Sequence, residues 1–302
     1  MIPNRSIAPP LTASCLAVLT LLLFLGVALL MGVHPLAAQE TDDEVRWRNS
    51  AELTYLLNGG NSESSTLGVR SLLRRTSARG ELRIDALTRR TDATRISRTA
   101  VGQDPDDFRV VEDRETERSA ERYSVQTRYD RTLTPRTFAF GGIGWERNTF
   151  AGFNHRTVAV TGAGGQWGDD RDWELKVGSG ITYTVQRDVT PDPEKDDSFA
   201  GLRINLDYNH QLTTGTEAEV QWVVDGNAQE MSDVRADLVQ AVSASLTNRL
   251  AIKTTLQLKL DNVPPVESVP LVTPDGEVTG DRVLVPLGRA DHSLSVALVI
   301  TL

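Results

Sequence analysis

The sequence predicts an all-β protein, a single antiparallel up-and-down transmembrane β-barrel of about 12 strands. Apolar and polar residues alternate with a period of two in twelve segments after residue 40, where no stretch has the spacing of an amphipathic helix. The number of segments is even, and their connections are alternately short and long. An outer-membrane barrel has tight turns on one side and longer loops on the other, whereas a β-sandwich has no reason for this asymmetry.

The N-terminal segment 1–38 is typical of a secretory signal peptide, which leaves 39–302 as the outer-membrane β-barrel domain. Arg5 precedes an uncharged apolar run, and cleavage is expected after Ala38. The run also reaches the roughly 20 residues that an uncleaved membrane anchor needs. The helix-breaking Pro35 and the small residues that follow it favour cleavage.

The first six predicted strands cover the N-terminal half of the barrel. The first strand carries Trp47 and Tyr55 on one face, while the alternation is weak in the second, third and sixth strands. These strands are 45–57, 64–75, 80–91, 119–130, 137–148 and 156–168.

The last six predicted strands alternate more clearly, except for 236–246. In the seventh, Trp173, Leu175 and Val177 alternate with polar or small residues, and the last strand alternates up to the end of the chain. These strands are 171–187, 198–211, 216–227, 236–246, 250–261 and 291–302.

The connections between these strands differ in length on the two sides. The even-numbered ones are short turns, and the odd-numbered ones are mostly longer, with about 27 residues at 92–118 and about 29 at 262–290. The segment 92–118 mixes charges of both signs, which is compatible with a polar loop that folds inward as a plug.

The two faces of the predicted strands differ in chemistry. Trp173 and Tyr183 share a face and would stand about 26 Å apart in height, close to the separation of two aromatic girdles. Leu256 and Leu258 are expected to face lipid. Residues of both charge signs are expected on the inner face, which suits an ion-pair lattice or a narrow pore: Arg83, Asp85, Gln126, Arg128, Glu174, Lys176, Arg203, Asn205, Asp207, Lys253 and Lys259.

The opening hairpin resembles that of the YdiY-like family, whose members are called salt-induced outer-membrane proteins and carry a domain of unknown function. The resemblance lies in a tryptophan-containing strand at 47–53 and a Gly-Asn turn followed by Ser and Thr residues at 59–68. It implies an outer-membrane location and a β-barrel, with no activity to carry over. Barrels of this kind usually end in Phe, whereas this chain ends in Ile300, Thr301 and Leu302.

No combination of residues predicts a catalytic, cofactor-binding or metal site. A lipase would need a serine and a histidine on one face, but His292 and Ser293 are neighbours and point to opposite faces of a strand. His155, in a predicted loop, and His210, near a turn, have no partner at triad-like spacing. The acidic segment 188–197 lacks the order and glycine of an EF-hand, and it is interpreted as a solvated loop.

Two glycine-rich patches at 141–144 and 162–165 lie within strand patterns. No Lys-Ser or Lys-Thr follows either patch, so a phosphate-binding loop is not predicted, and the glycines are expected to ease curvature of the wall. The net charge of −9 argues against nucleic acid as a partner, because a polyanion would be repelled. The single cysteine, Cys15, excludes a disulfide framework.

The sequence therefore predicts a protein of the cell outer membrane that is not an enzyme and needs no cofactor. The expected role is structural or stress-related, with narrow passage of small solutes. The expected partners are outer-membrane lipids and the outer-membrane assembly machinery. Two alternatives stay open, a barrel-scaffold enzyme of the lipase type and a soluble periplasmic β-sandwich that binds a ligand.

Overall fold

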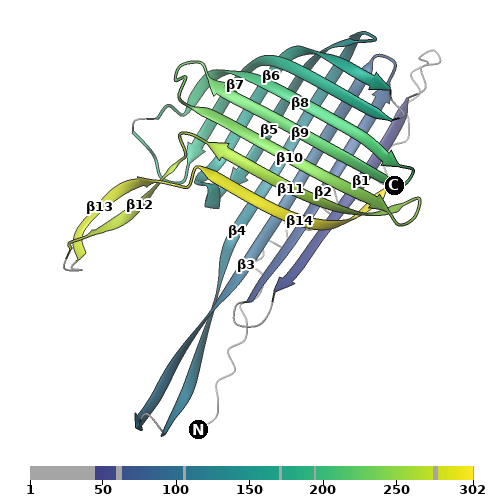
Figure 1. The fold of residues 1–302 in the computed structure, drawn as a ribbon. Helices are drawn as coiled ribbons and strands as arrows, with labels where there is room; N and C mark the ends of the chain where they lie inside the picture. Colours follow the sequence, from purple (N-terminus) through teal and green to yellow (C-terminus); the bar gives the residue numbers. More distant parts are fainter. Residues whose placement is uncertain are drawn as a thin grey trace, which may run out of the picture. The chain divides into compact units, whose positions relative to one another are not determined.

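The computed structural model describes residues 45–58, 63–104, 107–169, 172–193, 195–274 and 278–301. In this part of the chain twelve antiparallel strands form a closed barrel (Figure 1), in the order β1-β14-β11-β10-β9-β8-β7-β6-β5-β4-β3-β2. The predicted fold class is confirmed, and the β-sandwich alternative is wrong. The expected signal peptide at 1–38 lies outside the described residues.

Each predicted strand corresponds to a strand of the barrel. The barrel strands are β1 (Arg46–Asn58), β2 (Glu63–Ser77), β3 (Gly80–Asp104), β4 (Asp107–Thr134), β5 (Thr137–Asn148), β6 (Phe153–Asp169), β7 (Trp173–Asp188), β8 (Ser198–Thr213), β9 (Thr216–Asn227), β10 (Val234–Ser245), β11 (Leu250–Asp261) and β14 (Ala290–Thr301). A short 3₁₀ helix, η1 (Thr149–Ala151), follows β5. No helix in the described ranges is long and apolar enough to cross a membrane.

The barrel closes between its first and last strands, where Ser50 of β1 is the register partner of Thr301 of β14. The seam holds four register pairs, from Ser50–Thr301 to Leu53–Leu298, so the two edges of the sheet pair over part of the length of β1 and β14. The chain therefore reaches its last described residue inside the wall itself.

The prediction of a loop at 92–118 is wrong. β3 and β4 continue as a paired ribbon to the register pair Asp104 and Asp107, and Figure 1 shows both strands running on together beyond the rest of the wall. The segment therefore does not fold into the lumen as a plug. Away from the membrane neither face of a strand needs apolar residues, so a polar ribbon carries no alternation that would distinguish it from a loop.

Two further connections also contain secondary structure. Within 262–290, β12 (Val266–Val272) and β13 (Val278–Pro286) form a separate two-stranded sheet. The other connection is 149–155, where β6 begins at Phe153. His155 therefore lies in a strand and not in a loop as predicted.

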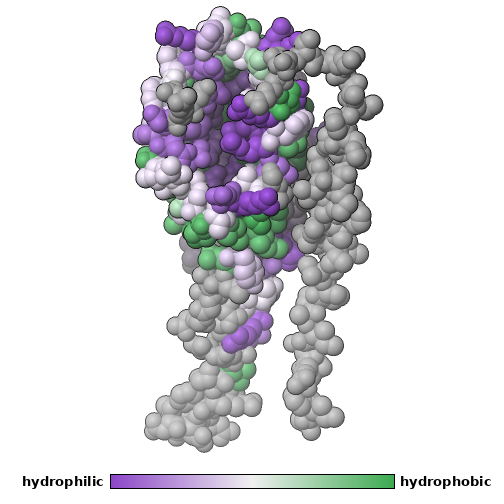
Figure 2. Space-filling model, turned by 90° about the vertical axis from the view of Figure 1, so that its right-hand side faces the viewer, coloured by the Kyte–Doolittle hydropathy of each residue, from purple (hydrophilic) through white to green (hydrophobic). Residues whose placement is uncertain are grey.

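The two faces of the wall differ as the sequence predicted. On β8 the side chains of Leu202 and Ile204 are 58% and 55% exposed on the outside, while the inward Asn205 is 2% exposed. Figure 2 shows one side of the surface, with hydrophilic side chains gathered in its upper part and hydrophobic side chains below them. A closed barrel that exposes apolar residues outside and buries polar ones inside has the pattern of a membrane-spanning wall.

The glycine-rich patches make room for aromatic rings inside the barrel. Phe138 and Phe140 of β5 point inward and are 2% and 3% exposed. A Cβ atom on Gly164 would lie 2.6 Å from the ring of Phe138, and one on Gly162 would lie 2.7 Å from the ring of Phe140. The glycines therefore serve packing, in addition to the curvature that the sequence suggested.

Candidate functional site

The lumen of the barrel is the candidate functional site. It contains a cavity of about 510 Å³, lined by charged and polar side chains from every part of the wall. Ten of the eleven predicted inward residues line this cavity, and Lys253 contacts two lumenal glutamates. The predicted inner face is confirmed.

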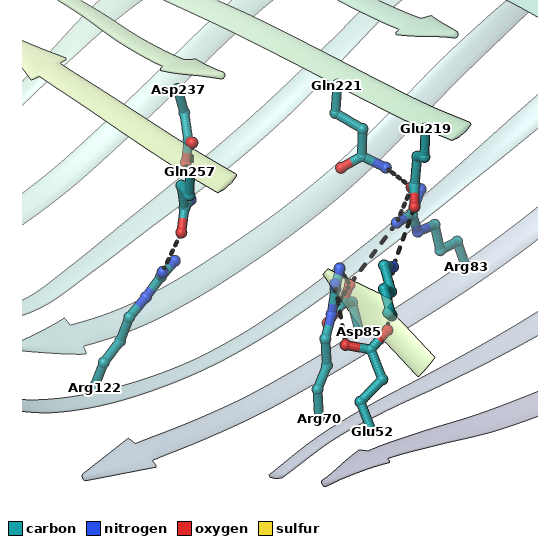
Figure 3. A network of polar contacts seen from close by, with 10 residues as sticks. Glu52, Arg70, Arg83, Asp85, Arg122, Glu219, Gln221, Asp237 and Gln257 are labelled. Carbon is teal, nitrogen blue, oxygen red and sulfur yellow. Dashed lines mark hydrogen bonds and ion pairs between the residues drawn. The ribbon is translucent and has the colours of Figure 1, made fainter. Parts of the chain in front are cut away.

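Six side chains form a closed ring of alternating charge across the lumen, here called the ion ring (Figure 3). Lys253 Nζ lies 3.2 Å from both Glu52 Oε1 and Glu219 Oε2. Arg70 Nε donates to Asp85 Oδ1 at 3.0 Å, and Arg70 Nη1 lies 3.8 Å from Glu52 Oε2. The ion ring consists of Glu52, Arg70, Asp85, Arg83, Glu219 and Lys253.

The ion ring bridges opposite walls of the barrel. Arg83 lies on β3 and Glu219 on β9, and six strand steps separate these two strands in either direction around the barrel. Arg83 Nη2 lies 4.0 Å from Glu219 Oε1 and 3.8 Å from Asp85 Oδ2. The side chains therefore meet across the full width of the lumen.

A second bridge joins another pair of opposite strands. Lys259 Nζ of β11 lies 3.3 Å from Glu146 Oε1 of β5, and these strands are also six steps apart. Arg122 Nε of β4 lies 2.8 Å from the same glutamate oxygen. Arg122 Nη1 also donates to Gln257 Oε1 at 3.2 Å, and Gln257 Nε2 donates to Asp237 Oδ1 at 2.8 Å (Figure 3).

A third group of contacts lies near the end of the barrel that carries the longer connections. Arg156 Nη2 of β6 lies 3.7 Å from Asp261 Oδ2 of β11, and Arg235 Nε lies 3.4 Å from the same carboxylate oxygen. Arg235 also stacks over the ring of Phe199 at 5.2 Å, and its Nη2 lies 3.3 Å from Asp233 Oδ2. Polar side chains thus fill this end of the lumen as well.

Two of the longer connections are joined above this group. Lys195, between β7 and β8, donates from Nζ to the carbonyl oxygen of Val263, between β11 and β12, at 2.9 Å. Burial lowers the pKa of Lys195 from its ordinary value, and the neighbouring Arg235 guanidinium lowers it further. Part of the acidic segment 188–197 also forms a side-chain hydrogen bond, since Gln186 Nε2 donates to Asp188 Oδ1 at 2.5 Å.

Not every lumenal ion pair crosses the barrel. Arg203 of β8 binds Asp225 of β9 with two hydrogen bonds of 2.7 Å, and these strands are neighbours. Such a pair strengthens the wall without narrowing the lumen. It provides a natural comparison for the bridges.

The residues weighed for catalysis do not come together. His292 is exposed and Ser293 is half-buried on the other face of β14, as the sequence predicted. His210 Nδ1 lies 3.1 Å from the hydroxyl oxygen of Tyr208, near the turn that follows β8. Within the described ranges, no group of three or more His, Cys, Asp or Glu side chains could hold a metal ion.

Sequence reasoning missed half of the ion ring. Glu52, Arg70 and Glu219 were not among the predicted inward residues, although Glu52 alternates with the outward Leu53 on β1. The alternation could have placed Glu52 inside the barrel. Which residues meet across the lumen depends on the stagger between strands, which no single strand encodes.

Comparisons with known proteins agree on a family and on a distant likeness of fold. The family described as "Protein of unknown function, DUF481" matches residues 51–270. No curated protein matches the chain. The NanC porin is similar in structure with a TM-score of 0.40 at 8% identity, and the match covers 84% of this chain and 98% of that chain.

Two other solved barrels are similar at the same level. The KdgM porin in complex with disordered oligogalacturonate has a TM-score of 0.38 at 5% identity, covering 84% of this chain and 98% of that chain. OmpT, an outer membrane protein of Vibrio cholerae, has a TM-score of 0.35 at 9% identity, covering 87% of this chain and 99% of that chain.

Proposed function

The chain belongs to the DUF481 family of proteins of unknown function, and we propose that it is an outer-membrane barrel with a structural, stress-related role in the cell envelope. In this proposal the lumen allows at most narrow passage of small solutes, and the chain is not an enzyme. The observation that carries the proposal is the bridging of the lumen between opposite strands, by Arg83 with Glu219 and by Glu146 with Lys259.

The outer surface supports the membrane location. On β14 the outward Leu294 and Val296 are 69% and 57% exposed, while Ser295 and Ala297 between and beyond them line the lumen. Soluble monomers rarely expose a continuous apolar surface, because water contact with it is unfavourable. Outer-membrane lipids would cover this surface.

Delivery to the outer membrane needs a leader segment and one further partner. The signal peptide at 1–38 would carry the chain across the inner membrane, and the outer-membrane assembly machinery would insert the barrel. In this proposal the last strand of the wall, β14, is the segment offered to that machinery.

Cell fractionation tests the location. The mature protein should be found with outer membranes and should migrate differently on a gel when it is left unboiled, because a stable barrel stays folded. Recovery in the soluble periplasmic fraction would end the proposal.

Planar-bilayer recordings test the bridged lumen. The intact protein should give small conductance at most. Removing both charges of one bridge, with Glu146→Gln and Lys259→Met together, should raise the conductance several-fold. Replacing both partners removes one charge of each sign from the lumen, and the glutamine keeps a hydrogen-bond acceptor for Arg122, which loses its carboxylate partner.

The matched control is the pair Arg203→Met and Asp225→Asn, which removes an ion pair between neighbouring strands. This control should leave the conductance unchanged, because its pair does not span the lumen. A large conductance in the intact protein that neither double variant alters would instead indicate an open general pore.

The lipase alternative is tested by His292→Ala and Ser293→Ala made singly. Since these side chains lie on opposite faces of β14, the unmodified protein should show no phospholipid hydrolysis for either substitution to reduce. Hydrolysis that both substitutions abolish would overturn the non-enzymatic assignment.

The stress-related role, which the YdiY-like resemblance suggests, predicts slower growth of a deletion strain in high salt.

A further inference from the structure

Arg89 of β3 is a lumen-facing arginine that has no counter-ion in the part of the chain that the structure describes. It lines the cavity, and its Nε atom is buried without a hydrogen-bond partner. The ion pairs between described residues of the lumen join other arginines and lysines to the carboxylates, and none of them includes Arg89. Arginine cannot shed its charge in a protein, so a guanidinium group inside a barrel is costly unless an anion accompanies it.

The wall around Arg89 is positively charged. Arg122 of β4 is its direct register partner on one side, and Gly68 of β2 is its partner on the other. In the adjoining row of the wall, Arg70, Leu87 and Ser124 line the same cavity. Two of these five neighbours carry a positive charge, and none carries a negative one.

The nearest carboxylates are already engaged. Arg70 is paired with Asp85 and Glu52 in the ion ring. Arg122 lies 2.8 Å from Glu146, which Lys259 also contacts. Each of the two neighbouring arginines therefore has an acidic partner, whereas Arg89 has none among the described residues.

The space beside Arg89 is open. Gly68 lies between Arg89 and Thr54 in one register row and leaves room for a small group: a Cβ atom there would be in ordinary van der Waals contact with Thr54 at 3.4 Å and with the Thr88 carbonyl oxygen at 3.7 Å. The hydroxyl-bearing Thr54 and Ser124 both line the cavity. At about 510 Å³ the cavity is within the range of small-molecule sites, which is roughly 300–1,000 Å³.

We propose that Arg89, supported by Arg122, forms a binding site in the lumen for the oxyanion group of a small solute. The planar guanidinium fork matches the oxygens of a carboxylate or a phosphate group, and hydroxyl groups add neutral donors. Gly68 places no side chain between its strand and the guanidinium group, which leaves that side of Arg89 free for the approach of a small anion. This site goes beyond the proposed function, because binding at equilibrium does not depend on whether the lumen conducts.

Calorimetry on the full mature chain, folded in detergent, tests the site with inorganic phosphate and with acetate as probes. The unmodified protein should bind phosphate, and Arg89→Met should weaken this binding at least tenfold. Arg89→Lys should retain part of the affinity, because the charge stays while the fork is lost. Binding of acetate as well as phosphate identifies a general oxyanion site, and binding of phosphate alone identifies a site for phosphoryl groups.

Two further variants distinguish a specific binding site at Arg89 from a general electrostatic attraction of anions into the lumen. Lys176→Met removes a lumenal charge that is paired with Glu174 at 3.2 Å, and it should leave phosphate binding unchanged. Gly68→Val keeps Arg89 but fills the gap beside it, and it should weaken binding. All variants are first checked for barrel formation by their migration when unboiled. No binding of either anion to the unmodified protein, or equal losses in Arg89→Met and Lys176→Met, would overturn the proposal.

Discussion

The lumen is filled in two different ways along its length. Toward the short turns, Phe138 and Phe140 pack against a wall of glycines, and Arg128 stacks over the Phe140 ring at 4.1 Å. The ion ring, and the Glu146–Lys259 bridge toward the longer connections, fill other parts of the same lumen with paired charges.

The difference concerns what each region tolerates. An apolar ring needs only a cavity of its own shape, so its loss leaves a void. A buried ion pair needs both partners, so the loss of one is harmful and the loss of both much less so. The aromatic region should therefore respond to volume, and the ionic region to charge balance.

The largest expected effect is in the aromatic region. Phe138→Ala should lower the free energy of unfolding by about 3–5 kcal/mol, because the ring is almost fully buried and leaves a cavity. Urea unfolding in detergent micelles, followed by tryptophan fluorescence, measures this loss. The loss should be the same at low and high salt, and a strong dependence on salt would contradict the apolar assignment.

The ion ring should behave in the opposite way. Lys253→Met leaves Glu52 and Glu219 without their shared cation, and it should cost about 3–4 kcal/mol. Adding Glu219→Gln in the same chain should restore at least half of the loss, because one buried carboxylate is removed. No recovery in the double variant would mean that Lys253 acts through packing alone.

The sequence predicted the ordered wall well and its extensions poorly. Alternation placed Leu258 outside and Lys259 inside because the membrane imposes one polarity on each face of a strand. The strand pairing within 92–118 was not predicted, because that constraint on polarity is absent beyond the membrane. The packing role of Gly162 and Gly164 was not predicted either, because contact with an aromatic ring on the neighbouring strand leaves no pattern in the local sequence.

The candidate site was predictable as a surface but not as a set of contacts. The sequence identified Arg83, Asp85 and Lys253 as inward, yet the partner of Arg83 lies on β9, about 135 residues further along the chain. The meeting of these side chains depends on barrel closure, strand stagger and side-chain length together. None of these can be read from one strand.

A third prediction compares the outer and inner faces of a single strand. Leu258→Arg places a charge on the outward face of β11, where the leucine is 40% exposed, and it should cost about 2–4 kcal/mol near the midplane of a bilayer. Gln257→Arg points into the polar lumen beside Asp237, to which Gln257 now donates at 2.8 Å; it gains a carboxylate partner, loses the acceptor of Arg122 Nη1, and should cost clearly less than Leu258→Arg. Unfolding in lipid vesicles compares the two variants, and equal losses would show that the assigned faces of β11 are wrong.

The smallest expected effect lies outside the membrane-spanning wall, at Lys195. Its pKa is lowered in the folded barrel by burial and by Arg235, so the unfolded chain binds this proton more tightly than the folded chain does. Between the lowered pKa and the ordinary value of 10.5, stability should therefore rise with pH, by less than about 1 kcal/mol because water partly screens the group. In Lys195→Met this contribution should disappear, together with the hydrogen bond to the carbonyl of Val263. Unfolding measured at a series of pH values up to 10.5 detects the difference in slope between the two proteins. A slope that is the same in both would mean that Lys195 is not desolvated in its loop, and that charge balance matters only within the lumen.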